Sequence, residues 1–430
     1  MTNVYIGLTA DILHPGIFNL IESAKPYGPI TVGLLTDAAV KGHKNLPSFT
    51  WEQRKLMVLG IAGVHSVVTQ DDWSYKTNIL KLRPKYFFHG DDWLNNSDST
   101  IRSEVIQALE SYGGKLIEVE YTKGVSASAL AMQAKEHASI PEIRISLFQR
   151  MLNSPRISRV MEVHSPISAM VVESARISSN SEIRTFDGFW SSSLADSAVL
   201  GLPDNELVSF NTRLENLRQI LNVSSLPLLF DGDTGGQIEH FTYNISQLVK
   251  VGVGGIIIED KKGLKRNSLI HEDSLHELEN PEKFAEKIAS GKFAVSDKKF
   301  SLIARLESLI AGRDINEAIE RATLYVAAGA DGIMIHSKQS SPNQVLDFAE
   351  RFRHLHSQIP LIAVPTTYNS IYESNLEEAG FNLVIYANHM LRSSIYSMKN
   401  TAQEILKNMR SYENEAVILP VSEILKVNEI

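Results

Sequence analysis

The stretch LLFDGDT at residues 228–234 is a short apolar run that ends in two carboxylates, Asp231 and Asp233. Seven other stretches in the second half of the chain have the same form, an apolar run followed at once by polar or charged residues. They lie at residues 160–164, 188–192, 256–260, 302–307, 333–337, 362–366 and 384–388. Amphipathic helical segments separate most of them, for example residues 316–328. Eight strand–helix units within about 230 residues predict a (β/α)8 barrel.

The charged residues after these runs favour the barrel over a second arrangement, a doubly wound open sheet. In an open sheet, strands could end in polar residues simply because every strand must stop. In a barrel, the carboxyl ends of all strands meet on one face, and barrel enzymes place their active sites there. Acidic, basic and imidazole side chains recur at successive strand ends of this chain, which is typical of such a face.

The first half of the chain alternates strands with helices. We expect strands at residues 4–9, 30–35, 66–69, 86–88 and 115–119, and helices near residues 50–62 and 103–112. Alternation of this kind predicts a parallel α/β sheet of the Rossmann type. The run Ser139-Ile140-Pro141 breaks a helix expected over residues 129–137, so we predict domains at residues 1–138 and 143–430.

The composition of the 430 residues excludes several classes of protein. Hydrophobic residues make up 43% and charged residues 21%, which rules out wholesale disorder. The net charge of −8 gives no support to nucleic acid as a partner, and the lack of cysteine excludes disulfides, thiolate metal sites and a cysteine catalyst. Residues 1–16 lack the features of a signal peptide, and no apolar run reaches about 18 residues. We therefore expect a soluble cytoplasmic protein without a membrane partner.

Three carboxylates at neighbouring strand ends predict a metal site. Asp231 and Asp233 are two residues apart, so on an extended strand both point to the same side, and Glu259 ends the next strand. Carboxylate oxygens in small number suit Mg²⁺, which keeps most of its waters. The pair alone could be a solvated acidic turn, but the convergence with Glu259 favours the metal.

Cationic groups follow around the same face. Arg305 within a strand-end layer indicates a planar anion, and His336, which alone could be a core histidine, gains a role in anion binding beside it. The polar, basic segment 261–268 is either a solvated loop or a lid that closes over an anionic substrate. These residues predict a Mg²⁺-dependent barrel enzyme with a small, multiply anionic substrate, and they leave the type of bond open.

Residues 143–430 resemble the phosphoenolpyruvate phosphomutases of the isocitrate lyase superfamily. The motifs that carry the resemblance are MEVH at 161–164, WSSSL at 190–194, DGDTG at 231–235, EDK at 259–261, KRNS at 265–268, ARLE at 304–307, HSK at 336–338 and ANH at 387–389. The resemblance implies interconversion of phosphoenolpyruvate and phosphonopyruvate, which makes the carbon–phosphorus bond of phosphonates.

The resemblance also implies roles for individual residues. Asp231 would touch Mg²⁺ directly, while Asp204, Asp233 and Glu259 would hold its waters. Asp204 could equally be a helix cap on sequence alone.

The remaining implied roles concern the substrate. The Trp190–Leu194 motif would cradle the pyruvate carboxylate together with Arg305, through Trp190, Ser192, Ser193 and Leu194. His336, Arg305 and Asn267 would steady the moving phosphoryl group, and Lys265 and Asn267 would belong to the closing loop. The family usually has glycine where this chain has Ser193.

Two other functions stay open within this resemblance. Cleavage of isocitrate or methylisocitrate is not one of them, because the superfamily's lyases carry a catalytic cysteine on the loop after the fourth strand and this chain has no cysteine. Phosphonopyruvate hydrolase is the nearer rival, although Asn267 favours the mutase. A non-catalytic scaffold that binds a phosphonate or a nucleotide is the third reading.

Residues 1–130 resemble the small cytidylyltransferases that carry an HxGH motif. The matching segments are DILHPGI at 11–17, Lys44, QR at 53–54, GDDW at 90–93 and GVSAS at 124–128. The resemblance implies that CTP is a substrate, and that the nucleotide-binding residues are His14, Gly16, Lys44, Ser126 and Ser128. Ile17 replaces the second histidine and Ala127 interrupts the serine-rich turn. Since loss of one transition-state donor costs about 10²–10³ in rate, we expect CTP binding with weak or absent transfer.

The end of the chain predicts self-association. Residues 395–410 are expected to be helical, and residues 416–421 form an apolar tail. Barrels of the family exchange such a C-terminal helix between subunits. We therefore expect a homo-oligomer, and specifically a tetramer.

Overall fold

The computed structural model describes residues 3–41, 43, 46–94, 99–120, 127–179, 182–263, 265–268, 276–296 and 299–427. The chain forms two compact units. The first comprises Met1–Ala138 and Arg176–Thr185, and the second comprises Ser139–Ala175 and Phe186–Ile430.

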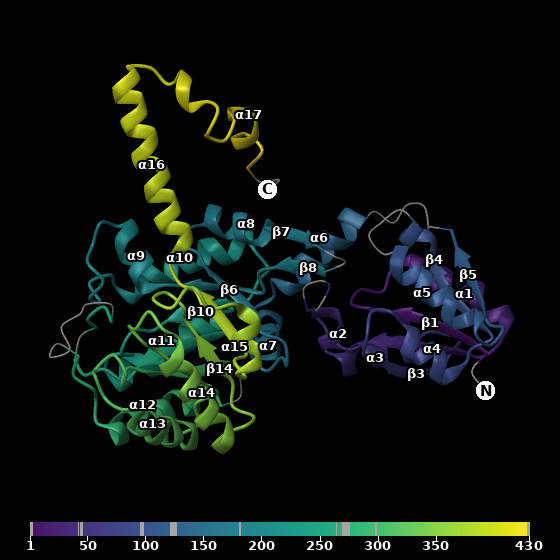
Figure 1. Ribbon diagram of the computed structural model, residues 1–430, viewed down its shortest axis with the longest axis horizontal. Coiled ribbons are helices and arrows are strands. Elements are labelled where there is room, and N and C mark those ends of the chain that lie inside the picture. The colour runs from purple at the N-terminus through teal and green to yellow at the C-terminus, as the bar shows by residue number, and fades with distance from the viewer. Residues whose placement is uncertain are drawn as a thin grey trace. The chain divides into compact units, whose positions relative to one another are not determined.

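A five-stranded parallel sheet forms the centre of the first unit, in the order β3-β2-β1-β4-β5 (Figure 1). Its strands are β1 (Val4–Leu8), β2 (Ile30–Leu35), β3 (Val64–Gln70), β4 (Tyr86–Gly90) and β5 (Lys115–Val119). The helices are α1 (Pro15–Ala24), α2 (Asp37–Lys41), α3 (Trp51–Leu59), α4 (Lys76–Leu82), α5 (Ser99–Glu110) and α6 (Ala127–Ala138). Every residue of β1 and β2 is buried, as expected for strands covered on both faces. The predicted Rossmann-like sheet is confirmed.

A closed barrel of eight parallel strands forms the second unit. The strands are β6 (Ser158–Glu162), β9 (Gly188–Ser191), β10 (Leu228–Asp231), β11 (Gly255–Glu259), β12 (Ser301–Leu306), β13 (Gly332–Ile335), β14 (Leu361–Ala363) and β15 (Leu383–Tyr386). Closure is direct, because Met161 of β6 pairs with Tyr386 of β15 on one side and with Phe189 of β9 on the other. The barrel is confirmed, and the open doubly wound sheet is excluded for this unit.

Helices alternate with most of the strands and pack on the outside of the barrel. They are α7 (Pro141–Leu152), α8 (Pro166–Ser174), α9 (Ser193–Val199), α10 (Phe210–Val223), α11 (Ile238–Val251), α12 (Pro281–Ala294), α13 (Ile315–Ala327), α14 (Asn343–Leu355) and α15 (Glu373–Glu378). In α11 the buried residues Phe241, Ile245 and Leu248 recur at helical spacing and join the large core cluster of the barrel. Gly252 ends this helix with φ of 85°, a conformation that favours glycine.

Two further features lie outside the regular alternation of strands and helices, and the second is the helix expected over residues 395–410, with different bounds. A short antiparallel hairpin, β7 (Arg176–Ser179) and β8 (Glu182–Thr185), interrupts the barrel sequence after α8 and groups with the first unit. The helix α16 (His389–Asn408) begins at the last strand and extends away from the barrel (Figure 1). It continues into η4 (Tyr412–Asn414) and α17 (Val421–Ile424).

Every helix in the described part of the chain is too short or too polar to span a membrane.

Candidate active site

The predicted site residues of the barrel lie where neighbouring strands end. Glu259 of β11 pairs with Arg305 of β12, and Arg305 pairs with Met334 of β13, two residues before His336. Asp231 ends β10 beside them. Since these strands are parallel and adjacent, one rim of the barrel gathers all four side chains.

Three carboxylates surround one ammonium group at this rim, and a fourth lies beside a neighbouring guanidinium. Lys265 Nζ lies 2.7 Å from Asp233 Oδ1, 3.3 Å from Asp204 Oδ1 and 3.5 Å from Asp231 Oδ2. Glu259, the fourth carboxylate, is buried beside Arg305 at 3.1 Å. We call Asp204, Asp231, Asp233 and Glu259 the carboxylate cluster.

Several oxygens of the carboxylate cluster have a cationic group nearby but no hydrogen bond of good geometry. Asp204 Oδ1, Asp233 Oδ1 and both Glu259 oxygens are buried and lack a well-directed hydrogen bond. Buried anionic oxygens are normally paired or bound to metal ions, so this donor set fits Mg²⁺. Among the described residues, no group of three Asp, Glu or His side chains has the geometry to hold one metal ion directly. That finding is compatible with a single direct carboxylate ligand whose neighbours act through water.

The ionisation of the cluster follows from burial and the cations nearby. Burial alone would raise the pKa of Asp231, but Lys265, Arg305 and Arg213 hold it well below its usual range. Burial raises the pKa of Glu259 to about 7 despite Arg305 and Lys261. Burial opposes the charge of Lys265, yet three aspartates raise its pKa above the usual value.

Arg305 and His336 form a second buried group on the same rim. Arg305 Nη2 donates to the Ser268 hydroxyl at 2.7 Å and lies 3.1 Å from His336 Nδ1. Glu307 Oε1 binds Arg305 Nε at 2.5 Å and lies 3.0 Å from His336 Nδ1. Burial and the adjacent guanidinium lower the pKa of His336. The neutral imidazole can therefore donate a hydrogen bond to an anion without adding a positive charge to the site.

The substrate-cradle residues lie at the start of α9. Trp190 is buried in β9, and Ser192 is the N-cap of α9, where its hydroxyl accepts from Ala195 N. Leu194 occupies the first turn and is half-buried. Ser193 contacts the carboxylate cluster directly, because its hydroxyl donates to Asp231 Oδ2 at 2.8 Å and contacts Lys265 Nζ. Ser193 thus touches the predicted metal ligand.

Asp204 and Asn267 meet across two loops. Asn267 Nδ2 donates to Asp204 Oδ2 at 2.8 Å. Asp204 is not a helix cap, since Ser209 caps α10. The contact brings together a residue of the segment after α9 and one of the segment after β11.

Arg213 belongs to no strand-end pattern and is not predicted from the sequence, and Glu307 lies in the predicted 304–307 motif without a role assigned to it. Arg213 of α10 is buried and donates to Asp196 Oδ2 at 2.8 Å, to the carbonyl of Asp231 at 2.6 Å and to Asp233 Oδ2 at 3.3 Å. Its guanidinium also lies 4.0 Å from the ring of Phe230. Arg213 therefore holds both the backbone of Asp231 and the side chain of Asp233 in the DGD turn.

In the first unit, His14 precedes α1 with an extended backbone and Pro15 begins the helix. His14 Nδ1 is buried without a hydrogen bond, and burial lowers the pKa of this histidine. Gly16 lies in the first turn of α1 and Ile17 is buried in the core of the sheet, 6% exposed. Of the other predicted nucleotide-binding residues, Lys44, Ser126 and the side chain of Ser128 lie outside the described residues.

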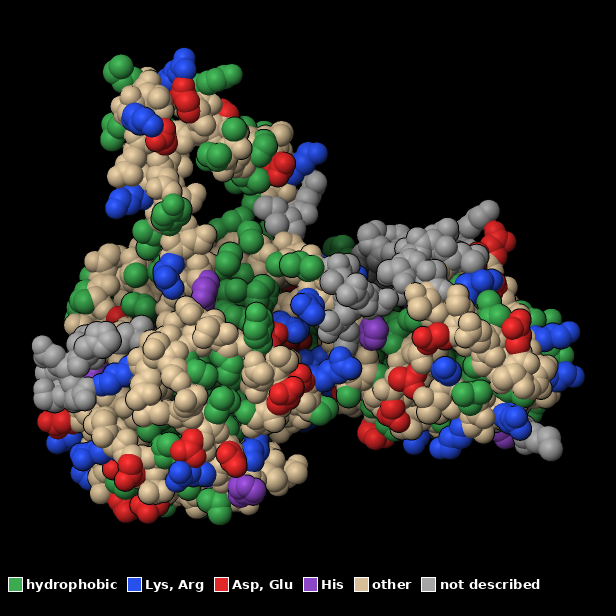
Figure 2. Space-filling model, viewed as in Figure 1, with side chains coloured by type: hydrophobic (Ala, Val, Ile, Leu, Met, Phe, Trp, Pro, Cys, Tyr) green, Lys and Arg blue, Asp and Glu red, His purple; other side chains and the backbone are tan. Residues whose placement is uncertain are grey.

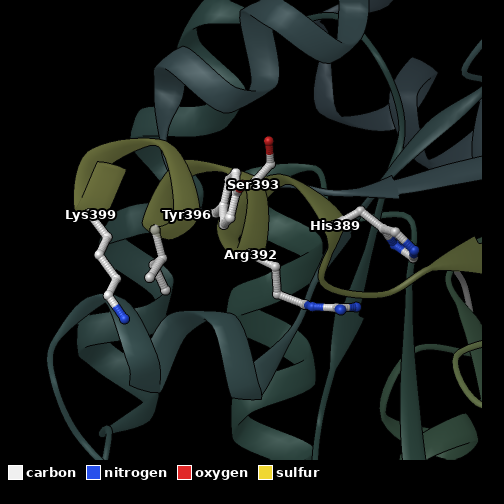
Figure 3. A pocket seen from close by; sticks show the side chains of 6 residues that line it. His389, Arg392, Ser393, Tyr396 and Lys399 are labelled. Atoms are coloured by element: carbon white, nitrogen blue, oxygen red, sulfur yellow. The ribbon is translucent and has the colours of Figure 1, made fainter. Parts of the chain in front are cut away.

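A separate pocket of about 620 Å³ lies along the first half of α16. The described side chains that line it belong to this helix: His389, Arg392, Ser393, Ile395, Tyr396 and Lys399 (Figure 3). The start of α16 is fixed to the barrel, because Glu162 of β6 accepts a hydrogen bond from Leu391 N at 3.0 Å. None of these lining residues belongs to the carboxylate cluster.

Comparison with known families assigns both units. The family described as "Phosphoenolpyruvate phosphomutase" matches residues 148–406, and the family described as "Cytidylyltransferase-like" matches residues 5–134. Phosphoenolpyruvate phosphomutase of Tetrahymena pyriformis is 33% identical over 283 residues, covering 66% of this chain and 88% of its own. Phosphonopyruvate hydrolase of Variovorax sp. is 34% identical over 278 residues, covering 64% of this chain and 91% of its own.

Solved structures divide in the same way. The phosphoenolpyruvate phosphomutase of Streptomyces platensis subsp. rosaceus superposes with a TM-score of 0.62 at 35% identity, covering 66% of this chain and 95% of its own. A phosphonopyruvate hydrolase, solved as a complex with oxalate and Mg²⁺, superposes with a TM-score of 0.59 at 32% identity and the same two coverages. Similarity of this degree to two different activities leaves the choice between them to the chemistry of the site.

Proposed function

Because this chain belongs to the phosphoenolpyruvate phosphomutase family of the isocitrate lyase superfamily, we propose that it interconverts phosphoenolpyruvate and phosphonopyruvate in phosphonate biosynthesis. The proposal rests on the carboxylate cluster, the neighbouring Arg305–His336 pair and the Asn267–Asp204 contact.

The carboxylate cluster would hold Mg²⁺, with Asp231 in direct contact and Asp204, Asp233 and Glu259 binding its waters. When bound, the metal supplies positive charge beside the carboxylate and enolate oxygens of the substrate. A phosphonopyruvate hydrolase of similar structure was solved with oxalate and Mg²⁺, which supports a Mg²⁺ site in this barrel. The start of α9, with Ser192, Ser193 and Leu194, would receive the substrate carboxylate together with Arg305.

The phosphoryl group would move between the enol oxygen and the methylene carbon of the same substrate. In the direction of phosphonate synthesis, the P–O bond breaks, the pyruvate enolate forms, and its methylene carbon takes the phosphorus to make the P–C bond. A loose transition state of this kind needs positioning and charge neutralisation more than a strong nucleophile. Arg305, His336 and Asn267 are proposed to hold the phosphoryl oxygens during the transfer.

The Asn267–Asp204 contact favours the mutase over the hydrolase. An amide cannot act as a general base toward water, whereas it can donate to a phosphoryl oxygen. Asp204 holds this amide at 2.8 Å, so the group is oriented before substrate arrives. Hydrolysis would instead require a water beside the phosphorus, which closure by the segment after β11 would exclude.

A direct test separates an enzyme from a binding scaffold. Purified protein with Mg²⁺ should consume phosphonopyruvate, and both EDTA and Asp231→Ala should stop this consumption. The exposed variant Glu215→Ala is the matched control and should retain the full rate. Binding of phosphonopyruvate without any consumption would favour the scaffold.

We further propose that the first unit binds CTP but transfers cytidylyl groups weakly or not at all. Ile17 offers no hydrogen bond and is buried among apolar neighbours, where the related enzymes carry a second histidine. Calorimetry with CTP and Mg²⁺ tests the binding, and pyrophosphate release in the presence of 2-aminoethylphosphonate tests the transfer. A rate increase in Ile17→His would show that the rest of the site is intact. Fast release by the unmodified protein would contradict the proposal.

Self-association is proposed from the C-terminal arm, which we define as residues 389–427. Its exposed apolar side chains are spread along its length (Figure 2), and they include Leu406 at 79%, Met409 at 90% and Leu425 at 78% exposure. Apolar surface of this extent is normally covered by a partner. A second copy of this chain is the proposed partner and a tetramer the proposed assembly. The cytoplasmic location expected from the sequence stays a prediction.

A further inference from the structure

We propose that Glu206 is a positioning residue that ties the segment after β11 to the DGDT turn after β10 and so keeps Lys265 and Asn267 at the carboxylate cluster. Glu206 lies between α9 and α10 and belongs to none of the predicted site residues. The kinetic consequence of this inference rests on the proposed mutase function, whereas its structural consequence does not.

One carboxylate oxygen of Glu206 makes all the relevant contacts. Glu206 Oε1 accepts from Lys265 N at 3.2 Å. It also accepts from the hydroxyl of Thr234 at 3.0 Å and from Thr234 N at 3.4 Å. Two loops that follow different strands therefore share a single acceptor.

Thr234 is the fixed side of this contact. Its carbonyl accepts from Lys287 Nζ of α12 at 2.8 Å, and its backbone follows Asp233, which Arg213 holds. The charge of Lys287 also faces Glu206, as does that of Asp233. Lys287 and the neighbouring Asp233 therefore hold Thr234 in place. Because Glu206 binds both Thr234 and Lys265 N, it holds the backbone of Lys265 at a fixed place relative to the DGDT turn.

Backbone conformation at the two ends of the contact supports a functional constraint. Glu206 has φ of 63° and Asp233 has φ of 52°, both in the left-handed region that favours glycine. Side-chain-bearing residues persist there only where surrounding contacts determine the conformation, and such positions cluster at functional sites. The hydrogen bonds to Thr234 and Lys265 are contacts of this kind.

The side chains beyond the contact show what it positions. Lys265 Nζ reaches Asp233 and Asp204, and Asn267 Nδ2 reaches Asp204. Loss of the Glu206 acceptor would leave these side chains on a backbone with one anchor fewer. Water would then enter more often during the lifetime of the transferring phosphoryl group.

Hydrogen–deuterium exchange tests the structural part without any turnover. In Glu206→Ala, amides of the described part of residues 261–268 should exchange about tenfold faster than in wild type, the equivalent of one hydrogen bond. Exchange in β10 and β11 should remain as in wild type. Glu206→Gln keeps an acceptor oxygen and should show a smaller change, while the exposed Glu215→Ala should show none. Unchanged exchange of the segment, or faster exchange throughout the barrel, would overturn the inference.

Product partition tests the kinetic part. Glu206→Ala should raise the proportion of phosphate and pyruvate among the products several-fold and lower kcat more than it alters KM. A lower rate with an unchanged product ratio would contradict the positioning role. If Glu206→Ala does not fold, Thr234→Val removes one donor to the same oxygen and should cause a smaller change of the same sign in both measurements. Absence of turnover in the wild-type protein would refute the proposed function and leave the exchange result to decide the role of Glu206.

Discussion

The ammonium of Lys265 lies 2.7 Å from Asp233 Oδ1, on a segment that follows a different strand from the aspartate. A buried lysine with this partner stays charged, because the aspartates outweigh the cost of burial and raise its pKa. The same carboxylate oxygens are the ones that Mg²⁺ would use through its waters. Lys265 would therefore share its electrostatic partners with a bound metal ion.

Lys265→Met should tighten divalent-metal binding while reducing turnover by at least about 10²-fold. Removal of the ammonium leaves more negative potential for the metal, but it also removes a donor from the reacting groups. Titration with Mn²⁺ followed by electron paramagnetic resonance measures the first effect. The exposed Lys262→Met is the control on the same segment. Weaker metal binding in Lys265→Met would contradict this account.

Asp231→Ala should abolish activity more completely than Asp233→Ala, because Asp231 alone is expected to touch the metal. Loss of a group that acts through a bound ligand or water typically costs about 10–100-fold. Mn²⁺ affinity and phosphonopyruvate consumption should rank the two variants in the same order. Equal and small losses of activity in both variants would contradict the assignment of Asp231 as the direct metal ligand.

The wild-type protein should be a tetramer in solution, and Leu406→Asp together with Ile395→Asp should shift it toward smaller species. Both side chains are exposed on α16, at 79% and 47%. A charge on each makes burial against a second copy unfavourable. Multi-angle light scattering measures the mass, with the exposed Lys407→Ala as control. A wild-type monomer at micromolar concentration would refute self-association.

The stability of the first unit should fall as the pH drops below about 6.5. Burial lowers the pKa of His14 in the folded state, so the unfolded chain takes up a proton first. The contribution of His14 to folding stability is therefore fully present above the pKa of the unfolded chain, and it is lost as the pH falls to the lower pKa of the folded state. Thermal unfolding from pH 7.5 to 5 should show a smaller decline in His14→Gln. An identical decline in both proteins would show that His14 does not contribute.

The sequence predicted both folds because their signals are local. Each of the eight barrel strands is a short apolar run, and its polar end marks the active rim, so Asp231, Glu259 and Arg305 could be expected together. The hairpin β7–β8 was missed, since its two four-residue strands have no apolar alternation. The predicted first and last residues of strands and helices differ from the observed ones by a few residues, because hydrogen bonding rather than composition ends an element.

The contacts that complete the site could not be predicted from spacing. Arg213 is an ordinary helical arginine in sequence, and only the packing of α10 against β10 brings it under Asp231 and Asp233. Glu206 sits in a loop whose conformation depends on donors from two distant segments. Such residues act through tertiary contacts, which leave no periodic pattern along the chain.

Phosphorus NMR of phosphonopyruvate incubated with the protein and Mg²⁺ tests the central claim most directly. The account predicts that the phosphonopyruvate signal falls while a phosphoenolpyruvate signal rises, and that Asp231→Ala shows neither change. Free phosphate with pyruvate as the only products would contradict the account and identify a phosphonopyruvate hydrolase.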